Sequence, residues 1–574
     1  MRVLIPLLLM VAACMPRGLP PPEAAPGPRS TVEVTTRDGV ALHTTVLLPR
    51  GEGPFPTVLI RVPYPMMGFL SWRCRVFNRH GYACAFQEVR GRGRSGGEWL
   101  PFEHEPEDAR DTLDWVADQP WCDGNIAMLG ESYLGAAAWS ALDDPPPALK
   151  TIIATVIGVD LYDASYEGGL FRHDIVTAWM AMMPGREFRY LSGSRRYHRA
   201  LARRPRMEMD VAAAGREIPW FRAWLSADRP DHPFWQREVV RRGDTLPERA
   251  TVPVLTMAGW SDAFLGPQIG SFERLATRDQ STLVIGPWDH LSRVAARQRQ
   301  HGLDDEVGLS DSYLQWDRVL DWLDHHLRGR PLRHRAGGVA SYTVNGGGWT
   351  WHEDWPPPTE PLSFALVEGD DPQRCTGALA DAPGEGEVSW IYDPEDPTPA
   401  RGGAGVLAGS FPLWRGPKPG FVAQGHLCRR RDDLVGFRSE PLAAPLHVVG
   451  GLRATLRVTT DAPDTAFLVR FLEERPGGRR IAVRETIRAL SDLPEGAPRP
   501  GDLVEVPLET WPVDYRFEAG SRLLVQVGSA SFPKYEAHAN TEEPWAEAVD
   551  LRPARQGLSL SGSAVTLPVI PGDP

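Results

Sequence analysis

A glycine-flanked serine is the residue of this sequence best placed to act as a nucleophile. The apolar run 126–129 leads into Gly130-Glu131-Ser132-Tyr133-Leu134-Gly135, and the helix-like segment 134–142 follows. A strand, a sharp turn and a helix in this order are typical of a nucleophile elbow, in which small residues let the serine hydroxyl project above the sheet edge. The spacing departs from G-x-S-x-G, because Leu134 occupies the second glycine position. On spacing alone, Ser132 is therefore either a nucleophile or a structural residue of a turn.

A base and an acid for this serine are predicted at the ends of two later strands. A serine hydroxyl needs a general base, and the base needs an orienting carboxylate. Asp262 follows the apolar run 252–258, and His290 follows the run 282–285, in the order Ser, acid, His that this elbow requires. Both strand ends lie at the carboxyl edge of an open α/β sheet, so the three side chains are expected to meet there. Asp289 is a weaker acid candidate, because it adjoins His290 and its side chain is expected to diverge.

The elements that would position these residues alternate between strands and helices. Buried strands are predicted at 57–62, 82–89, 126–129, 151–157, 252–258 and 282–285, with helices at 107–118, 134–142 and 312–328. This alternation predicts a parallel sheet covered by helices on both faces, preceded by an antiparallel hairpin at 31–36 and 40–49.

Two further regions are predicted around this core. The segment 160–249 has helical spacing and no convincing strand, so it is interpreted as a helical insertion above the sheet. After Trp355, short alternating runs predict an all-β sandwich. The predicted divisions are a core in two parts (30–158 and 250–355), a helical cap (159–249) and a β-domain (356–574).

Three of these segments together resemble the bacterial cocaine esterase (CocE/NonD) family of acyl esterases. They are Gly130 to Gly135, Gly259-Trp260-Ser261-Asp262 and Gly286-Pro287-Trp288-Asp289-His290. The family is related to the X-Pro dipeptidyl peptidases (peptidase family S15) and the α-amino acid ester hydrolases, and the extra residue before the second glycine is its own form of the elbow. The resemblance covers essentially the whole mature chain. It implies an α/β-hydrolase core, a helical cap and a C-terminal jelly roll.

The resemblance also implies a role for individual residues. Ser132 would be the nucleophile, His290 the general base and Asp262 its orienting acid. The oxyanion would be stabilised by the backbone N–H of Tyr133 and by the hydroxyl of Tyr64, which matches the family's tyrosine after the first core strand. The loop Gln87 to Gly96 also matches, although Glu88 stands where the family more often has Asp.

The predicted activity is that of a serine hydrolase that cleaves ester or amide bonds of small molecules or short peptides through an acyl-enzyme. One alternative is an aminopeptidase of the X-Pro class or an α-amino acid ester hydrolase. Another is an inactive lipid-anchored protein that binds a glycan or a partner, which is disfavoured because every catalytic position holds a competent residue. No cofactor or metal is expected, and Gly91-x-Gly93-x-x-Gly96 is not followed by the helix that a dinucleotide site needs.

Substrate selection is assigned to the start of the insertion and to nearby tryptophans. If Asp163 and Glu167 face the nucleophile, they would hold a substrate's free amino group; if they face solvent, they have no such role. Trp179, Trp260 and Trp288 favour an apolar acyl group or an aromatic group.

The charge balance bears on possible partners, and the N-terminus bears on location. The 62 Lys and Arg residues against 74 Asp and Glu give a net charge of −12, which argues against a nucleic-acid binder. Arg2, the apolar run 3–11 and Ala12-Ala13-Cys14 resemble a lipoprotein signal, with cleavage after residue 13 and lipid attachment at Cys14. The proline-rich segment 14–29 would then be a tether, and the protein would be exported and anchored at the cell envelope, at the outer membrane if the host has one.

The remaining cysteines allow disulfides in an exported protein. Five are left once Cys14 is assigned to the lipid, so an odd one stays unpaired. Cys375 and Cys428 are the first pair to expect, because both lie in the C-terminal region.

Overall fold

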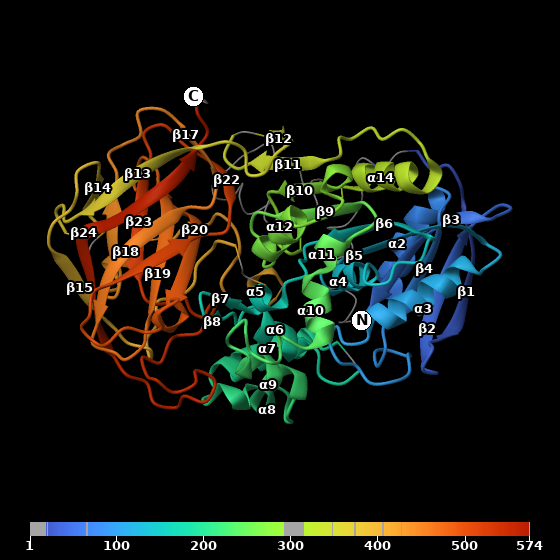
Figure 1. Cartoon of the computed structure of the whole chain (residues 1–574), viewed down its shortest axis with the longest axis horizontal. Coiled ribbons are helices and arrows are strands. Elements are labelled where there is room, and N and C mark those ends of the chain that lie inside the picture. Colours follow the sequence, from blue (N-terminus) through green and yellow to red (C-terminus); the bar gives the residue numbers. More distant parts are fainter. Residues whose placement is uncertain are drawn as a thin grey trace.

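The computed structural model describes residues 19–572 except 20, 65–66, 187, 292–314, 347, 372–374, 405–406, 412 and 426. An α/β core, a helical cap and a C-terminal β-domain make up the described chain (Figure 1). Cys14 and the predicted signal lie outside the described residues. Within the described part, no helix is long and apolar enough to cross a membrane.

The described residues of the core form a ten-stranded sheet in the order β1-β2-β4-β3-β5-β6-β9-β10-β11-β12. Neighbours from β4 to β11 are parallel, whereas β1 with β2, β2 with β4 and β11 with β12 are antiparallel. The predicted hairpin and parallel sheet are therefore confirmed, and the unpredicted strands β11 and β12 extend the sheet. The strands are β1 (Pro26–Thr35), β2 (Ala41–Pro49), β3 (Phe55–Val62), β4 (Ala83–Glu88), β5 (Cys122–Glu131), β6 (Leu149–Thr155), β9 (Val254–Gly259), β10 (Thr282–Gly286), β11 (Gly338–Thr343) and β12 (Gly348–His352).

Helices cover both faces of this sheet, as its near-continuous apolar strands require. Apolar side chains of α3 (Glu105–Ala117), α4 (Tyr133–Ser140) and α12 (Leu265–Glu273) join one core cluster. Those of α2 (Met67–Arg79) and α14 (Trp316–Arg328) join a second cluster. Each element that carries a predicted catalytic residue is thus fixed between two packed layers.

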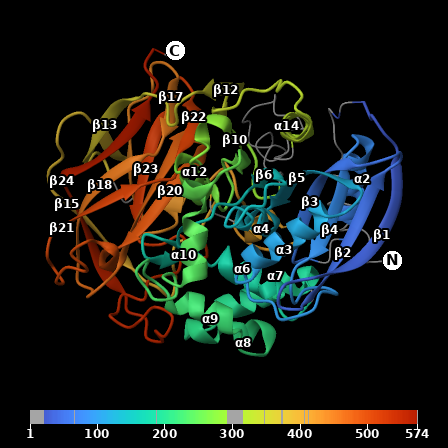
Figure 2. The ribbon, with the colours of Figure 1, turned by 45° about the vertical axis from the view of Figure 1, so that its right-hand side comes forward.

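The insertion is mainly helical, as predicted, and lies along the lower side of the molecule in Figures 1 and 2, next to both the core and the β-domain. Its helices are α5 (Leu161–Ser165), α6 (Val176–Met182), α7 (Tyr190–Leu201), α8 (Met209–Ala214), α9 (Pro219–Ser226), α10 (Glu238–Asp244) and α11 (Leu246–Arg249). The expectation of no strand is wrong in one place, where β7 (Tyr166–Glu167) and β8 (Leu170–Phe171) form a small hairpin. Two-residue strands are too short to show alternation in a sequence. Gly168, which follows β7, lies so close to the β-domain that no side chain would fit. A Cβ there would lie 2.1 Å from the carbonyl oxygen of Ile487.

The C-terminal region is the predicted jelly-roll β-domain, in which the 16-residue strand β24 pairs with β13, β15, β17 and β18. Its strands are β13 (Glu360–Val367), β14 (Gly377–Ala380), β15 (Glu387–Tyr392), β16 (Val435–Arg438), β17 (Leu446–Gly450), β18 (Arg453–Thr460), β19 (Ala466–Glu474), β20 (Arg480–Ala489), β21 (Val504–Glu509), β22 (Val513–Phe517), β23 (Arg522–Gly528) and β24 (Ala554–Val569).

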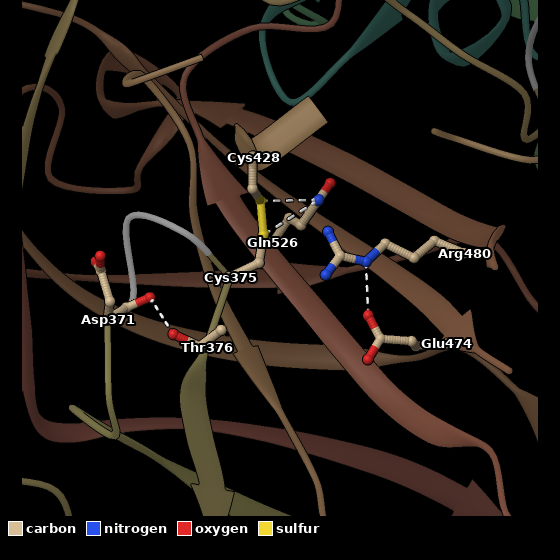
Figure 3. Close-up of a disulfide and its surroundings, with 7 residues drawn as sticks. All are labelled: Asp371, Cys375, Thr376, Cys428, Glu474, Arg480 and Gln526. Carbon is tan, nitrogen blue, oxygen red and sulfur yellow. Dashed lines mark hydrogen bonds and ion pairs between the residues drawn. A yellow bond between two sulfur atoms is a disulfide. The ribbon is translucent and has the colours of Figure 1, made fainter. Parts of the chain in front are cut away.

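Two disulfides lie within the described residues. The predicted Cys375–Cys428 disulfide is confirmed, and the side-chain amide of Gln526 donates to both of its sulfur atoms (Figure 3). The other joins Cys74 to Cys84, and with them α2 to β4. Cys122 is the odd cysteine, a buried thiol.

A buried carboxylate links the cap to the β-domain. Glu536 of the β-domain forms ion pairs with Arg204 at 2.7 Å and Arg206 at 3.0 Å, and it also contacts the imidazole of His173. Burial by itself raises the pKa of Glu536, but the cationic partners, Arg206 first, hold it well below its usual range. The cap is therefore tied to the β-domain by a largely buried charge cluster, in which Arg204 has the most exposed side chain at 16%.

Candidate active site

The turn that carries Ser132 has the geometry of a nucleophile elbow. Ser132 lies between β5 and α4 with φ 55° and ψ −128°, a strained conformation for a serine. A Cβ on Gly130 would lie 2.2 Å from the carbonyl carbon of Leu134, and one on Gly135 would lie 2.6 Å from Ile157 Cγ2. Both glycines are therefore needed. Gly135 lies one residue later than the second glycine of the common pattern, at the point where α4 packs against Ile157, just after β6.

The structure brings the three predicted side chains together. His290 Nε2 lies 3.0 Å from Ser132 Oγ, and His290 Nδ1 lies 2.8 Å from Asp262 Oδ2. The other carboxylate oxygen of Asp262 accepts the backbone N–H of Phe264 at 2.7 Å, which fixes the carboxylate plane. Asp289 turns elsewhere, since its Oδ1 accepts the backbone N–H of Leu291. The arrangement can move a proton from the serine hydroxyl to an imidazole that a buried carboxylate orients.

Two tyrosines flank the serine hydroxyl. The hydroxyl of Tyr64 interacts with that of Ser132 and accepts the indole N–H of Trp179 at 3.2 Å. Burial raises the pKa of Tyr64 to about 12, so this hydroxyl keeps its proton and remains a donor. Tyr133 is the first residue of α4, where backbone N–H groups have no acceptor within the helix. Its own hydroxyl donates to Glu105 Oε1 at 2.9 Å, which anchors the ring away from the reacting atoms.

The loop after β4 supports the Tyr64 segment. Arg92 donates from Nε to the carbonyl of Pro63 at 2.8 Å, and its guanidinium lies 4.8 Å from the ring centroid of Trp99. Glu88 accepts the backbone N–H of Arg94 at 2.9 Å, so the carboxylate that replaces the family's Asp holds the loop closed. Sequence reasoning recognised this loop but missed Arg92. The sequence feature that could have identified Arg92 is an arginine within a glycine-rich segment that follows a predicted strand.

A cavity of about 50 Å³ opens beside Ser132 and is called the inner cavity here. Its wall is largely aromatic and aliphatic, and among the described residues none of its lining side chains is charged. The lining residues are Tyr64, Phe102, Ser132, Tyr133, Ile157, Leu161, Ala164, Ser165, Ile175, Val176, Trp179, Trp224, Phe264 and Leu407. Trp179 is thus a wall residue as expected, and Phe102, Trp224 and Phe264 are wall residues that the sequence did not reveal.

Trp260 and Trp288 are not substrate-binding residues, contrary to the prediction. Both side chains are fully buried in the core. The indole N–H of Trp260 donates to the carbonyl of Tyr342 at 2.7 Å. Trp288 fills the space left by Gly259 and Gly286, where a Cβ would lie 2.6 Å and 2.1 Å from its ring. Their place next to predicted catalytic positions in the chain reflects packing beneath the site.

Asp163 and Glu167 also face away from the inner cavity. Leu161, Ala164 and Ser165 of the same short segment line the cavity, whereas Asp163 projects from the opposite, exposed side of α5. Glu167 lies in the β7–β8 hairpin and accepts the hydroxyl of Tyr535 in the β-domain at 2.8 Å. The prediction that these carboxylates hold a substrate amino group is therefore wrong.

Comparison with known proteins agrees with this geometry. Residues 38–292 match the X-Pro dipeptidyl-peptidase (S15) family, and residues 337–555 match the X-Pro dipeptidyl-peptidase C-terminal non-catalytic domain. The cocaine esterase of Rhodococcus sp. (strain MB1 Bresler) is 31% identical over 549 residues, covering 89% of this chain and 92% of that protein. The chain belongs to the cocaine esterase family. It is accordingly a serine hydrolase that acts on ester or peptide-like bonds.

Solved structures share the fold of this cocaine esterase family member over nearly its whole length. An α-amino acid ester hydrolase superimposes with a TM-score of 0.75 at 23% identity, covering 97% of this chain and 98% of that one. An aminopeptidase from the marine sediment archaeon Thaumarchaeota archaeon has a TM-score of 0.75 at 22% identity, covering 97% and 99%. These likenesses establish that core, cap and jelly roll form one conserved architecture.

Proposed function

We propose that this serine hydrolase is an acyl esterase that cleaves neutral carboxylic esters through an acyl-enzyme on Ser132. The proposal rests on two hydrogen bonds. One joins Ser132 Oγ to His290 Nε2 at 3.0 Å, and the other joins His290 Nδ1 to Asp262 at 2.8 Å. In this arrangement, Ser132 is the nucleophile, His290 the general base and Asp262 the orienting acid.

The proposed reaction has two halves. Ser132 Oγ attacks the ester carbonyl while its proton passes to His290 Nε2, and the hydroxyl of Tyr64 and the backbone N–H of Tyr133 donate to the resulting oxyanion. The imidazolium then gives its proton to the departing alkoxide, which leaves as the alcohol. In the second half, His290 takes a proton from water, the hydroxide attacks the acyl-enzyme, and the proton returns to Ser132 as the carboxylic acid leaves.

The cavity wall favours an esterase over an aminopeptidase. A free α-amino group buried beside the nucleophile needs a carboxylate partner, because an unpaired buried charge is costly. The described wall of the inner cavity consists of apolar, aromatic and hydroxyl side chains, and Asp163 and Glu167 point elsewhere. Neutral acyl groups are therefore the proposed substrates.

Labelling with a fluorophosphonate probe tests the nucleophile. The wild-type protein should label, and Ser132→Ala should not. Ser165→Ala is a matched control, because Ser165 lines the same cavity but its hydroxyl donates to the carbonyl of Leu161 at 2.7 Å. A wild-type protein that never labels would support the binding-protein alternative.

Turnover of simple acyl esters against X-Pro anilides tests the substrate class. The proposal expects ester turnover that does not depend on a free N-terminus. Faster cleavage of X-Pro anilides than of esters, lost when the N-terminus is blocked, would support the aminopeptidase alternative instead.

We also propose that the protein is exported and anchored to the cell envelope by a lipid on Cys14, at the outer membrane if the host has one. The lipoprotein-like sequence before Cys14 supports this, and so do two disulfides, which persist in oxidising compartments. Wild-type cells fed an alkyne-tagged fatty acid should label the protein and retain it in the membrane fraction. Cys14→Ser should abolish both, and equal labelling of the two proteins would contradict the anchor.

A further inference from the structure

A second cavity lies directly behind the wall of the inner cavity. This outer cavity has a volume of about 70 Å³ and lies between α9 and α10 of the cap and α3 and α4 of the core. Its lining includes Ala136 and Trp139 of α4 and Val240 and Gly243 of α10. This volume has room for the end of an apolar chain, because one water-sized group needs about 10–15 Å³ of it.

Three residues line both cavities and so form the partition between them: Phe102, Leu161 and Trp224. Phe102 is held in this place by several contacts. Its ring stacks on Tyr133, with centroids 4.7 Å apart, and on Trp224 at 6.3 Å, and its backbone N–H donates to the Tyr133 hydroxyl at 3.1 Å. Its φ of 66° is unfavourable for a bulky side chain, and such strain persists only where the surroundings fix the residue.

The charged side chains around the outer cavity are paired with one another. Arg237 of the cap meets Glu103 of the core at 3.2 Å, and Arg242 donates to Asp143 at 3.1 Å. Glu105, at the inner end, accepts the Tyr133 hydroxyl and is ion-paired with Arg61. Because these charges satisfy each other, the cavity offers its apolar surface rather than a charge to an occupant.

We propose that the outer cavity is a second substrate subsite, which takes the far end of an elongated apolar chain of the ester, and that Phe102 determines how far that chain reaches. This inference rests on the proposed esterase function. The ester carbonyl lies at Ser132, the nearer part of the chain fills the inner cavity, and the remainder passes the Phe102 ring into the outer cavity. Short esters use the inner cavity alone.

The test compares long and short esters in variants that block the outer cavity. Gly243 lies in α10 and lines the cavity, and a Cβ added there meets no atom within 4 Å, so Gly243→Phe adds bulk without a backbone clash. Gly270→Phe is the matched control, because Gly270 is also a helical glycine with open space at its Cβ and lines neither cavity. Val240→Trp, one turn earlier on α10, is a second block.

Two ratios of kcat/KM are measured. The acyl series compares p-nitrophenyl decanoate with p-nitrophenyl acetate, and the alcohol series compares decyl acetate with ethyl acetate, so that either arm of the ester is sampled. Gly243→Phe and Val240→Trp should lower the ratio about tenfold or more in at least one series, since each buried methylene is worth roughly a factor of four. Gly270→Phe should keep the wild-type ratio. Phe102→Ala should raise the ratio, because it removes the ring that separates the cavities.

The inference is overturned if both blocking variants keep the ratio of Gly270→Phe in both series. It is also overturned if they slow acetate and decanoate equally, which would make the outer cavity a general passage, or if Phe102→Ala leaves the ratio unchanged. Failure of the esterase proposal looks different, because the wild-type protein would then turn over neither acetate nor decanoate.

Discussion

Tyr64→Phe isolates one hydroxyl at the proposed oxyanion site. The substitution removes a single oxygen and keeps the ring, which packs against Phe188 with centroids 5.0 Å apart. The lost hydroxyl interacts with Ser132, and because burial raises the pKa of Tyr64 to about 12, it is protonated at neutral pH. Loss of one oxyanion donor lowers kcat by about 10²–10³, or about 2.7–4 kcal/mol of transition-state stabilisation. KM should change by less than about threefold, because the ground-state carbonyl carries less charge than the oxyanion.

Steady-state hydrolysis of a p-nitrophenyl ester measures this effect. The matched control is Tyr162→Phe, which removes a cap hydroxyl that donates to the carbonyl of Asp228 at 3.1 Å, and it should keep kcat within about twofold. A thermal melt of each variant shows whether the fold is retained. If Tyr64→Phe retained more than about a third of wild-type kcat, the tyrosine would not be an oxyanion donor and the reasoning from its position would be refuted.

Three other predictions concern the triad, a buried acid and a disulfide. Asp262→Asn should lower kcat by about 10⁴, because the carboxylate no longer orients His290; a loss below tenfold in steady-state kinetics would contradict the assigned role. Burial raises the pKa of Asp174 to about 7, so between about pH 4 and 7 the folded protein keeps a proton that the unfolded chain releases, and this group makes stability fall as pH rises. In Asp174→Asn, urea unfolding should therefore show a smaller decline across that window, and parallel declines in both proteins would refute the assignment. Replacing Cys375 and Cys428 by serine opens a loop of 53 residues and should cost about 4 kcal/mol in urea unfolding, against about 3 for the 10-residue loop of the other disulfide; the opposite ranking would show that loop entropy does not dominate.

Much of the core was predictable because its elements carry strong local signals. The strands of the parallel sheet are continuous apolar runs, and two glycines, Gly130 and Gly135, flank Ser132 closely in the chain. Strand β12 was missed because it is partly exposed at the sheet edge and its residues show little apolar alternation. Strand β11 was missed because its buried residues, Gly338–Thr343, are mostly small or polar. The β7–β8 hairpin was missed because two residues per strand give no pattern.

The substrate residues show where sequence reasoning fails. Trp260 and Trp288 adjoin catalytic positions in the chain, yet both lie under the site in the core. Asp163 and Glu167 begin the insertion, yet one faces outward and the other contacts the β-domain. Proximity in sequence to a catalytic residue does not specify the direction of a side chain, which depends on the packing of the whole cap.

The amino-acid sequence by itself determined the order of the elements and the identity of the groups able to do the chemistry, because strand periodicity, glycine spacing and the succession of serine, acid and histidine are local properties. Only the tertiary structure decided which residues surround the substrate. The walls of both cavities combine side chains from the core and the cap, such as Phe102 and Trp224, and the inner cavity adds Leu407 of the β-domain. These residues lie far apart in the sequence. Their meeting depends on how the cap packs, and that follows from many weak apolar contacts summed over three regions rather than from any single segment.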